Sequence, residues 1–193
     1  MVFDGRPLSQ ITDDEINALV KEQVSEHQYL EFKTTINSKD SRDKIEMLRD
    51  VTSMANGGGG YLIVGIKENG KGQAVRYASA EEIGNIESIK KSLMDLCNEY
   101  ISERIYGLEA ETRTIEGNQI LIVKIPVSSR TPHMATYENR TDFYTDTTIP
   151  TGFGITTTDR TGKDLGYNAY SLNNGCEGCG DVFDSFPDYN YTG

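Results

Sequence analysis

The chain of 193 residues carries 30 Asp and Glu side chains against 19 Lys and Arg, a net charge of −11 at pH 7. Charged residues make up 25% of the chain and apolar residues 36%, which excludes a chain disordered throughout and a membrane-embedded chain. The acid excess argues against a broadly basic nucleic-acid-binding surface. Three cysteines, an odd number, argue against a disulfide framework. We therefore expect a cytoplasmic protein with no signal peptide and no contact with a membrane.

The composition changes after residue 150. Residues 151–193 are rich in Gly, Thr, Asn, Asp and Tyr, and their two basic and six acidic side chains give a net charge of −4, which leaves −7 for residues 1–150. The apolar residues of this tail follow neither a helical nor a strand period. We predict a globular domain over residues 1–150 and an acidic, irregular or disordered tail over residues 151–193.

Capping signals predict three helices. Thr12, followed three residues later by a glutamate, starts the first helix, and Ser41 starts a second that ends in a run of four glycines. Ser79 opens a third helical region that leads into a long helix over residues 86–102. Each helix has apolar residues at spacings of three and four, which is typical of one buried face.

Alternating and continuous apolar runs predict the strands. Residues 29–33 alternate, which places Glu31 and Lys33 on the same side of one strand. Residues 61–66 are almost all apolar, as in a strand buried on both faces. Further strands are expected over residues 108–115, 119–127 and around 142–144, with a turn at 67–72 and a loop over 130–147. Interleaved helices and strands favour an α/β or α+β fold with a mixed sheet.

Three glutamates and a lysine lie around the ends of the first two predicted strands. Glu26 and Glu31 belong to the first strand region, with Lys33 beside them, and Glu68 follows the second strand. Carboxylates that converge can hold a divalent cation that activates water, and a lysine can contact a phosphate. The alternative is that Glu26 is surface charge, Glu31 pairs with Lys33, and Glu68 belongs to an ordinary turn.

Two other motifs carry weaker signals. The glycines at 57–60 lie between a helix and a strand, the reverse of the order in nucleotide-binding loops, so they are interpreted as a helix cap and turn. Cys176 and Cys179 have the spacing of half a zinc site, but no second pair follows, so zinc is not expected there. Cys97 lies on an apolar helical face and is predicted to be in the core.

Basic residues are few and dispersed. Lys39 and Arg42 lie near the start of the second helix among acidic neighbours, as on a solvated, ion-paired face. Arg130, His133 and Arg140 follow the last long strand and could add phosphate contacts.

The order of the motifs along the chain is more specific than any one of them. It runs through Glu-x-x-x-x-Glu-Phe-Lys at 26–33, Ala-Asn-Gly-Gly-Gly-Gly at 55–60, Tyr-Leu-Ile-Val-Gly-Ile at 61–66, Lys-Glu-Asn-Gly-Lys-Gly at 67–72, Arg-Thr-Pro-His at 130–133 and Asp-Phe-Tyr at 142–144. This combination resembles the Schlafen AlbA-like domain family. The resemblance implies an α/β (α+β) fold, a twisted mixed sheet flanked by helices.

The resemblance also implies a function. In the Schlafen nucleases, a three-carboxylate site with a divalent metal cuts structured RNA such as transfer RNA. Carried over by position, Glu26, Glu31 and Glu68 would be catalytic and would bind Mg²⁺ or Mn²⁺, with Lys33 adjacent. Two positions depart from the family pattern, because Glu68 stands where Asp is usual and residues 145–147 lack the usual arginine. The expected nucleic-acid contacts are Lys33, Lys39, Arg42, Arg130, His133 and Arg140.

The expected function is therefore that of a metal-dependent endoribonuclease, with RNA or DNA as partner. One alternative is a non-catalytic nucleic-acid-binding or regulatory module, such as a transcriptional regulator, that uses the same face. Another is an interaction protein that binds a protein partner through its acidic tail. A homo-oligomer also stays open.

Overall fold

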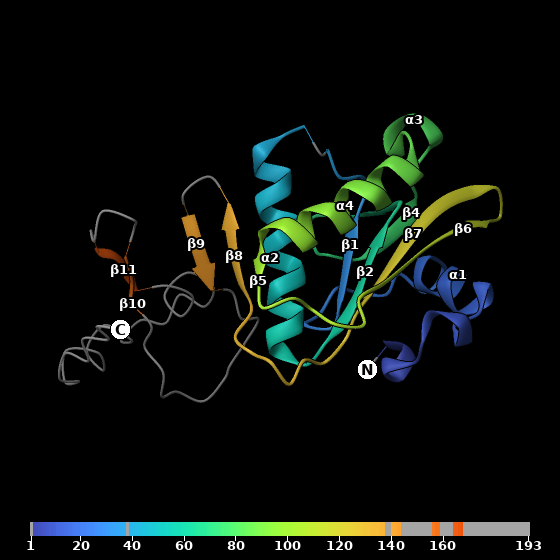
Figure 1. The fold of residues 1–193 in the computed structure, drawn as a ribbon. Coiled ribbons are helices and arrows are strands. Elements are labelled where there is room, and N and C mark those ends of the chain that lie inside the picture. Colours follow the sequence, from blue (N-terminus) through green and yellow to red (C-terminus); the bar gives the residue numbers. More distant parts are fainter. Residues whose placement is uncertain (1, 38, 138–139, 144–155, 159–163, 168–193) are drawn as a thin grey trace.

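The computed structural model describes residues 2–37, 39–137, 140–143, 156–158 and 164–167 (Figure 1). Its helical elements are η1 (Val2–Gly5), η2 (Leu8–Gln10), α1 (Asp13–Lys21), α2 (Ser41–Gly57), α3 (Ala80–Ile83) and α4 (Ile86–Tyr100). Its strands are β1 (Leu30–Lys33), β2 (Gly60–Val64), β3 (Ile66–Glu68), β4 (Ala74–Tyr77), β5 (Ile101–Ser102), β6 (Glu109–Ile115), β7 (Asn118–Ile125), β8 (Met134–Tyr137), β9 (Arg140–Phe143), β10 (Thr156–Thr158) and β11 (Asp164–Tyr167).

The central sheet is mixed, with the strand order β1-β2-β7-β6. β1 and β2 run parallel, whereas β7 is antiparallel to both of its neighbours, β2 and β6. Three smaller antiparallel sheets pair β3 with β4, β10 with β11, and β8 with both β5 and β9. The predicted α/β (α+β) class with a mixed sheet is confirmed.

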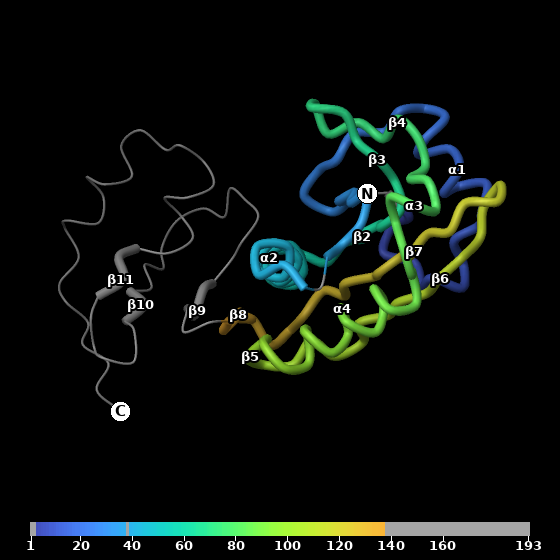
Figure 2. Tube along the Cα trace, turned by 90° about the horizontal axis from the view of Figure 1, so that it is seen from above, coloured from blue at the N-terminus to red at the C-terminus, as the bar shows by residue number. Residues whose placement is uncertain are grey.

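One face of the central sheet packs against α2 and α4 (Figure 1). Leu48 and Val51 of α2 and Leu93 of α4 meet Leu62 and Val123 of the sheet in a continuous apolar core. All five side chains are at most 1% exposed, so this layer is fully shielded from water. Burying each such side chain contributes about 1.5–3 kcal/mol. In Figure 2 the helix α2 is seen nearly end-on beside β2.

The opposite face of the sheet is covered by the N-terminal segment, including α1 (Figure 2). Here Ile16 and Leu19 of α1 pack against Phe32, Ile63 and Ile122. Strand β2 is therefore buried on both faces, as its sequence predicts. Successive side chains of β1 point to opposite faces of the sheet. Phe32 therefore lies in this layer, whereas its neighbours Glu31 and Lys33 point toward the α2 side.

The chain bends at Gly65, and the predicted strand over residues 61–66 divides there into β2 and β3. Gly65 has a φ of +103°, and a Cβ atom at this position would lie 2.7 Å from the carbonyl oxygen of Gln119. Only glycine tolerates both conditions. The chain then enters the β3–β4 hairpin, so the predicted turn at 67–72 is wrong for Lys67 and Glu68, which belong to β3.

Two predicted helix starts are also corrected. Asp40, not Ser41, caps α2, because its carboxylate accepts hydrogen bonds from the backbone N–H groups of Arg42 and Asp43. The Ser79 capping box is confirmed, but α3 ends after one turn and Asn85 caps α4 separately. Helix α4 ends at Tyr100.

The predicted loop over residues 130–147 contains β8, which was not expected, and β9 (Arg140–Phe143), which overlaps the strand expected around residues 142–144. Residues Met134–Tyr137 form β8, which pairs with Ile101 and Ser102 of β5 and with β9. Within the predicted tail, β10 and β11 pair with each other, and the other tail residues lie outside the described residues, so the division at residue 150 stays a prediction. No helix among the described residues is long and apolar enough to span a membrane.

Candidate acidic site beside strand β1

The first part of the site is an ion-pair cluster between β1 and α2. The Lys33 ammonium lies 2.5 Å from Oε1 of Glu31 and 3.0 Å from Oδ2 of Asp50 on α2. The side chains of Lys33, Glu31 and Asp50 are only 23%, 25% and 12% exposed, so water screens this cluster weakly. Arg49 adds a longer contact of 3.5 Å to Asp50. The cluster joins the end of β1 to the middle of α2.

Glu26 lies at the outer edge of β1. Its backbone N–H donates to the carbonyl oxygen of Gly72 at 2.8 Å, and its Oε1 accepts a hydrogen bond from the Phe32 N–H, also at 2.8 Å. Because β1 is an edge strand of the central sheet, this N–H has no neighbouring strand to bind, and Glu26 supplies the acceptor. A Cβ atom at Gly72 would lie 3.0 Å from Glu26 Oε2, so the glycine makes room for the carboxylate.

The surroundings raise the pKa of both Glu26 and Glu31. Burial raises the pKa of Glu26 to about 7, and the charges of Glu31 and Glu68 add to the effect, while the Phe32 N–H and Lys33 oppose it. Burial also raises the pKa of Glu31, with a further contribution from Asp50 that Lys33 partly offsets. Burial lowers the pKa of Lys33, but Asp50 and Glu31 outweigh it, and the net shift is upward. The carboxylates around Lys33 are thus more numerous than the cations that neutralise them.

The predicted metal ligands are near one another without forming a metal site. Glu68 is exposed on β3, and its charge acts on Glu26. However, no three His, Cys, Asp or Glu side chains in the described part of the chain are arranged to hold a metal ion. The Lys33 ammonium already lies between Glu31 and Asp50. The oxygen donors suit Mg²⁺ or Mn²⁺ chemically, but in this arrangement they do not fit a shared ion.

Sequence reasoning missed Asp50. The residue lies within the acidic and basic pattern of α2 that was interpreted as a solvated face. Its position three residues after Met47 and four before Met54, both buried, places it on the same face of the helix as the core. A carboxylate at a core-facing position is rarely buried unless it is paired. This helical spacing was the signal that could have identified it.

The predicted phosphate contacts fall at opposite ends of α2. Lys39 and Arg42 are exposed near its start, whereas Arg130 is exposed in the segment that follows β7. That segment is tied to the other end of the helix, because Asn56 exchanges two hydrogen bonds with the backbone of His133. A helix rises 1.5 Å per residue, so the two groups are about 20 Å apart along its axis. They do not form one basic patch.

His133 is a correction to the predicted contacts. Its side chain is 0% exposed, and its Nδ1–H donates to the carbonyl oxygen of Glu103. A buried imidazole bound to the backbone does not reach a phosphate at the surface. The side chain of Arg140 lies outside the described residues, and so do Cys176 and Cys179. Cys97 is buried, as predicted, and burial raises the pKa of its thiol to about 12.

The glycine run is a helix cap and turn, as predicted. Gly58 has a left-handed conformation at the end of α2, with its N–H bound to the carbonyl oxygen of Met54. A Cβ atom at Gly59 would lie 2.8 Å from the carbonyl oxygen of Ile125, so the glycines also allow the chain to pass close to β7. The run therefore has a structural explanation that requires no nucleotide.

The fold and the site together define a mixed α/β domain whose edge strand carries a partly buried lysine paired with carboxylates. A family model described as Schlafen, AlbA_2 matches residues 26–148, well over half of the chain. The chain belongs to this Schlafen AlbA-like family. The comparison with curated proteins finds no significant match.

Two solved structures match part of this chain. The N-terminal domain of an ATP-dependent DNA helicase RecG-related protein from Nitrosomonas europaea matches at 24% identity and a TM-score of 0.43, covering 61% of this chain and 71% of that one. The DIP2311 protein from Corynebacterium diphtheriae matches at 15% identity and a TM-score of 0.39, covering 63% of this chain. The match spans only 26% of the length of that second protein.

Proposed function

We propose that this domain acts on nucleic acid, and that it cleaves structured RNA such as transfer RNA at the acidic site beside β1. The observation that carries the proposal is the pairing of Lys33 with Glu31 and Asp50, together with Glu26 nearby, whose carboxylate is under the charges of Glu31, Glu68 and Lys33. Membership of the Schlafen AlbA-like family supports the same assignment. Clusters of carboxylates with shifted pKa values are typical of sites that move protons.

The side chains suggest individual roles in cleavage. A carboxylate whose pKa is about 7 can accept a proton from an attacking hydroxyl and return it to a leaving group at neutral pH, so Glu26 is the proposed general base. Lys33 is the only ammonium in the cluster and is the group placed to contact a phosphate oxygen. Glu31 and Asp50 hold that ammonium in position.

The described arrangement does not form a metal site, so no step is assigned to Mg²⁺ or Mn²⁺. Whether the reaction requires either ion is itself part of the test. Binding of an ion would neutralise carboxylates that now repel one another, and it would therefore raise the melting temperature. Melting curves with and without Mn²⁺ measure this independently of activity.

The experiment incubates the purified full chain with transfer RNA, in separate reactions with Mn²⁺ and with a chelator. We expect discrete fragments from the wild type and none from Glu26→Gln or Glu31→Gln. The matched control is Glu22→Gln, a change of the same chemistry at an exposed position just after α1. Intact RNA with the wild type, or equal cleavage by all four proteins, would remove the nuclease proposal.

A second candidate is a non-catalytic nucleic-acid-binding module. The observation that favours it is the position of Lys33, which already neutralises Glu31 and Asp50 and makes the cluster a stable structural link between β1 and α2. This candidate predicts that RNA or DNA is retained without cleavage. It also predicts that Glu26→Gln and Glu31→Gln still retain the nucleic acid, because each change removes a negative charge from the binding face and no catalytic group is needed.

A further inference from the structure

Two of the most exposed large apolar side chains lie close together, far along the chain from the acidic site. Tyr106 is 63% exposed and Val127 is 73% exposed. They belong to neighbouring segments, because a Cβ atom at Gly107 would lie 3.8 Å from the side chain of Pro126. Exposed aromatic residues carry a cost in water, and such a patch often marks a binding surface.

Arg130 packs on this patch. Its guanidinium lies 4.9 Å from the centre of the Tyr106 ring, within the range of a cation–π interaction. The ring is still mostly exposed, so Arg130 covers only part of it. An aromatic ring with an arginine beside it presents a stacking surface and a positive charge at the same place.

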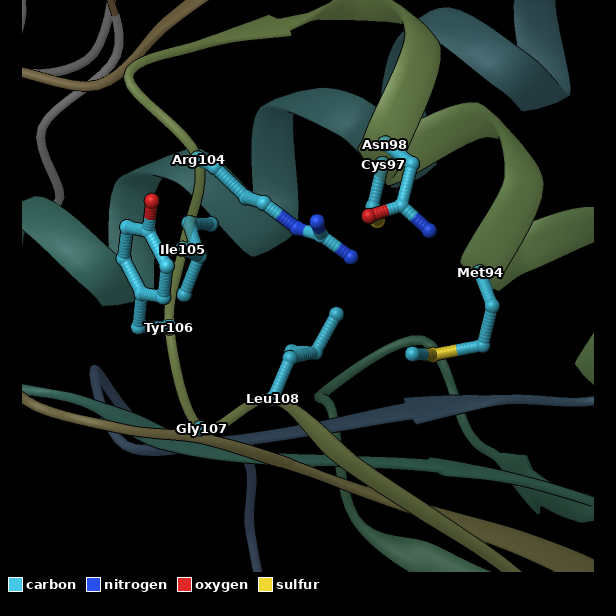
Figure 3. A pocket seen from close by; sticks show the side chains of 8 residues that line it. All are labelled: Met94, Cys97, Asn98, Arg104, Ile105, Tyr106, Gly107 and Leu108. Atoms are coloured by element: carbon cyan, nitrogen blue, oxygen red, sulfur yellow. The ribbon is translucent and has the colours of Figure 1, made fainter.

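A cavity of about 200 Å³ adjoins the same segment (Figure 3). Its lining consists of Met94, Cys97, Asn98, Arg104, Ile105, Tyr106, Gly107 and Leu108. The Arg104 guanidinium is directed into the cavity, between Leu108 and Asn98 (Figure 3). The volume is below the roughly 300–1,000 Å³ of typical cofactor or drug pockets, so the cavity suits a fragment the size of one base or one sugar phosphate.

The residues that line the cavity carry one positive charge, that of Arg104, although the whole protein is acidic. None of the residues lining the cavity is acidic, and across the described part of the chain no carboxylate pairs with Arg104. Glu103 and Glu99 are exposed neighbours in sequence that do not line the cavity. Among the residues that the structure describes, neither Arg104 nor Arg130 has a carboxylate partner. Arg130 lies beside the exposed Tyr106 ring and Arg104 lines the adjoining cavity, so both are available to an anion that carries a flat ring.

We propose that Tyr106, Arg130 and Arg104 form a docking site for an unpaired nucleotide of single-stranded RNA. The base stacks on Tyr106, and the flanking phosphates contact the two guanidinium groups, one of which lies in the cavity. Stacking on aromatic side chains requires a base that is not held in a duplex. The site rests on the proposed action on nucleic acid, and it lies apart from the acidic cluster where cleavage is proposed.

The chain contains no tryptophan, so Tyr106→Trp places a single tryptophan, which can be excited separately from the tyrosines, in the site and keeps a stacking surface. The experiment titrates this full-length variant with an oligouridylate of about 10 nucleotides, a length within the usual range of single-strand sites. We expect quenching by the single strand and none by a duplex RNA of the same length. Free UMP should bind more weakly, because it lacks the second phosphate; equal affinity for UMP would overturn docking of a strand.

Affinities of the variants complete the test. Tyr106→Ala should weaken binding of the oligouridylate by about 5- to 150-fold, which corresponds to the 1–3 kcal/mol of one stacked base. Arg130→Gln and Arg104→Gln should each weaken it as well. The matched controls are Val75→Ala, another exposed apolar side chain, and Lys91→Gln, an exposed cation on α4. Circular dichroism confirms that each variant is folded.

The outcomes separate this inference from the proposed function. If the wild type binds or cuts RNA and Tyr106→Ala does so equally well, the docking site is overturned while the function stands. If the wild type neither binds nor cuts any RNA, both fall. If the controls lose as much affinity as Tyr106→Ala, the contacts are distributed over the surface and the site is again overturned.

Discussion

Glu26 is under two opposing influences. Its carboxylate accepts the Phe32 N–H and so satisfies the edge of the central sheet, an interaction that favours the ionised form. Burial and the charges of Glu31 and Glu68 favour the protonated form more strongly, and the pKa rises to about 7. The side chain therefore loses its proton near neutral pH, which links the ionisation of this one residue to the stability of the fold.

The first prediction concerns the pH dependence of stability. Because the pKa of Glu26 is higher in the folded chain than its ordinary value of 4.5, the folded state binds the proton more tightly, and stability falls as the pH rises from about 4.5 to 7. Glu26→Gln keeps an acceptor for the Phe32 N–H but has no charge. We expect the variant to gain free energy of unfolding relative to wild type at pH 8 and to match it near pH 4.5, measured by urea unfolding. A difference that does not vary with pH would contradict the shifted pKa.

The second prediction concerns the ammonium of Lys33. Lys33→Gln leaves Glu31 and Asp50 facing each other in a poorly hydrated place, and we expect a loss of about 2 kcal/mol, less than for a fully buried pair because the side chains keep some exposure. The control is Lys21→Gln, whose pair with Glu116 is more than half exposed on both sides. Its loss should stay below about 1 kcal/mol. Similar losses in urea unfolding of the two variants would show that the cluster is not a strong link.

The sequence indicated part of this site. The alternation of β1 predicted that Glu31 and Lys33 share a side, because strand geometry is local. The sequence did not indicate that Asp50 completes the pair or that Glu26 binds the strand edge. Both contacts depend on how α2 and the Gly72 turn pack against β1, which is decided by tertiary structure.

Among the elements, the bend between β2 and β3 depends on one residue. Gly65→Ala would require a φ near +103° in a residue with a Cβ atom, and that atom would overlap the Gln119 carbonyl oxygen and the Ile83 side chain. We expect a loss of more than about 2 kcal/mol in the free energy of unfolding. The control is Gly70→Ala, where a Cβ atom would meet nothing within 4 Å. A loss at Gly65 no larger than at Gly70 would contradict the strained geometry.

Elements with local signals were predicted well, and elements made by distant pairing were not. Thr12 and Ser79 form the capping boxes that their sequences indicate. Strand β8 was predicted as loop because its partners, β5 and β9, include a segment of only two residues that carries no strand pattern. Propensity cannot identify a strand whose stability comes from pairing with a segment about 30 residues away.

Across the whole molecule, the net charge of −11 and the few exposed arginines set how nucleic acid can be held. Lys39 and Arg42 are about 20 Å along α2 from the end of that helix to which the Arg130 segment is tied. Lys33 is occupied by two carboxylates. The protein therefore lacks a broad positive surface in its described part, and the electrostatic share of binding should come from a small number of phosphate contacts.

The last prediction is the salt dependence of RNA binding. For single strands, the logarithm of the binding constant falls with the logarithm of salt concentration by about 0.7 for each neutralised phosphate. Two contacts, at Arg104 and Arg130, give a slope of about −1.4, whereas participation of Lys39 and Arg42 as well would give about −2.8. Fluorescence titrations of the oligouridylate at several salt concentrations measure the slope.

Arg130→Gln should reduce the slope by about 0.7, and Arg42→Gln should leave the slope unchanged. A steep slope that both variants reduce equally would mean that both ends of α2 contact the strand. In that case the RNA would have to extend along the length of α2.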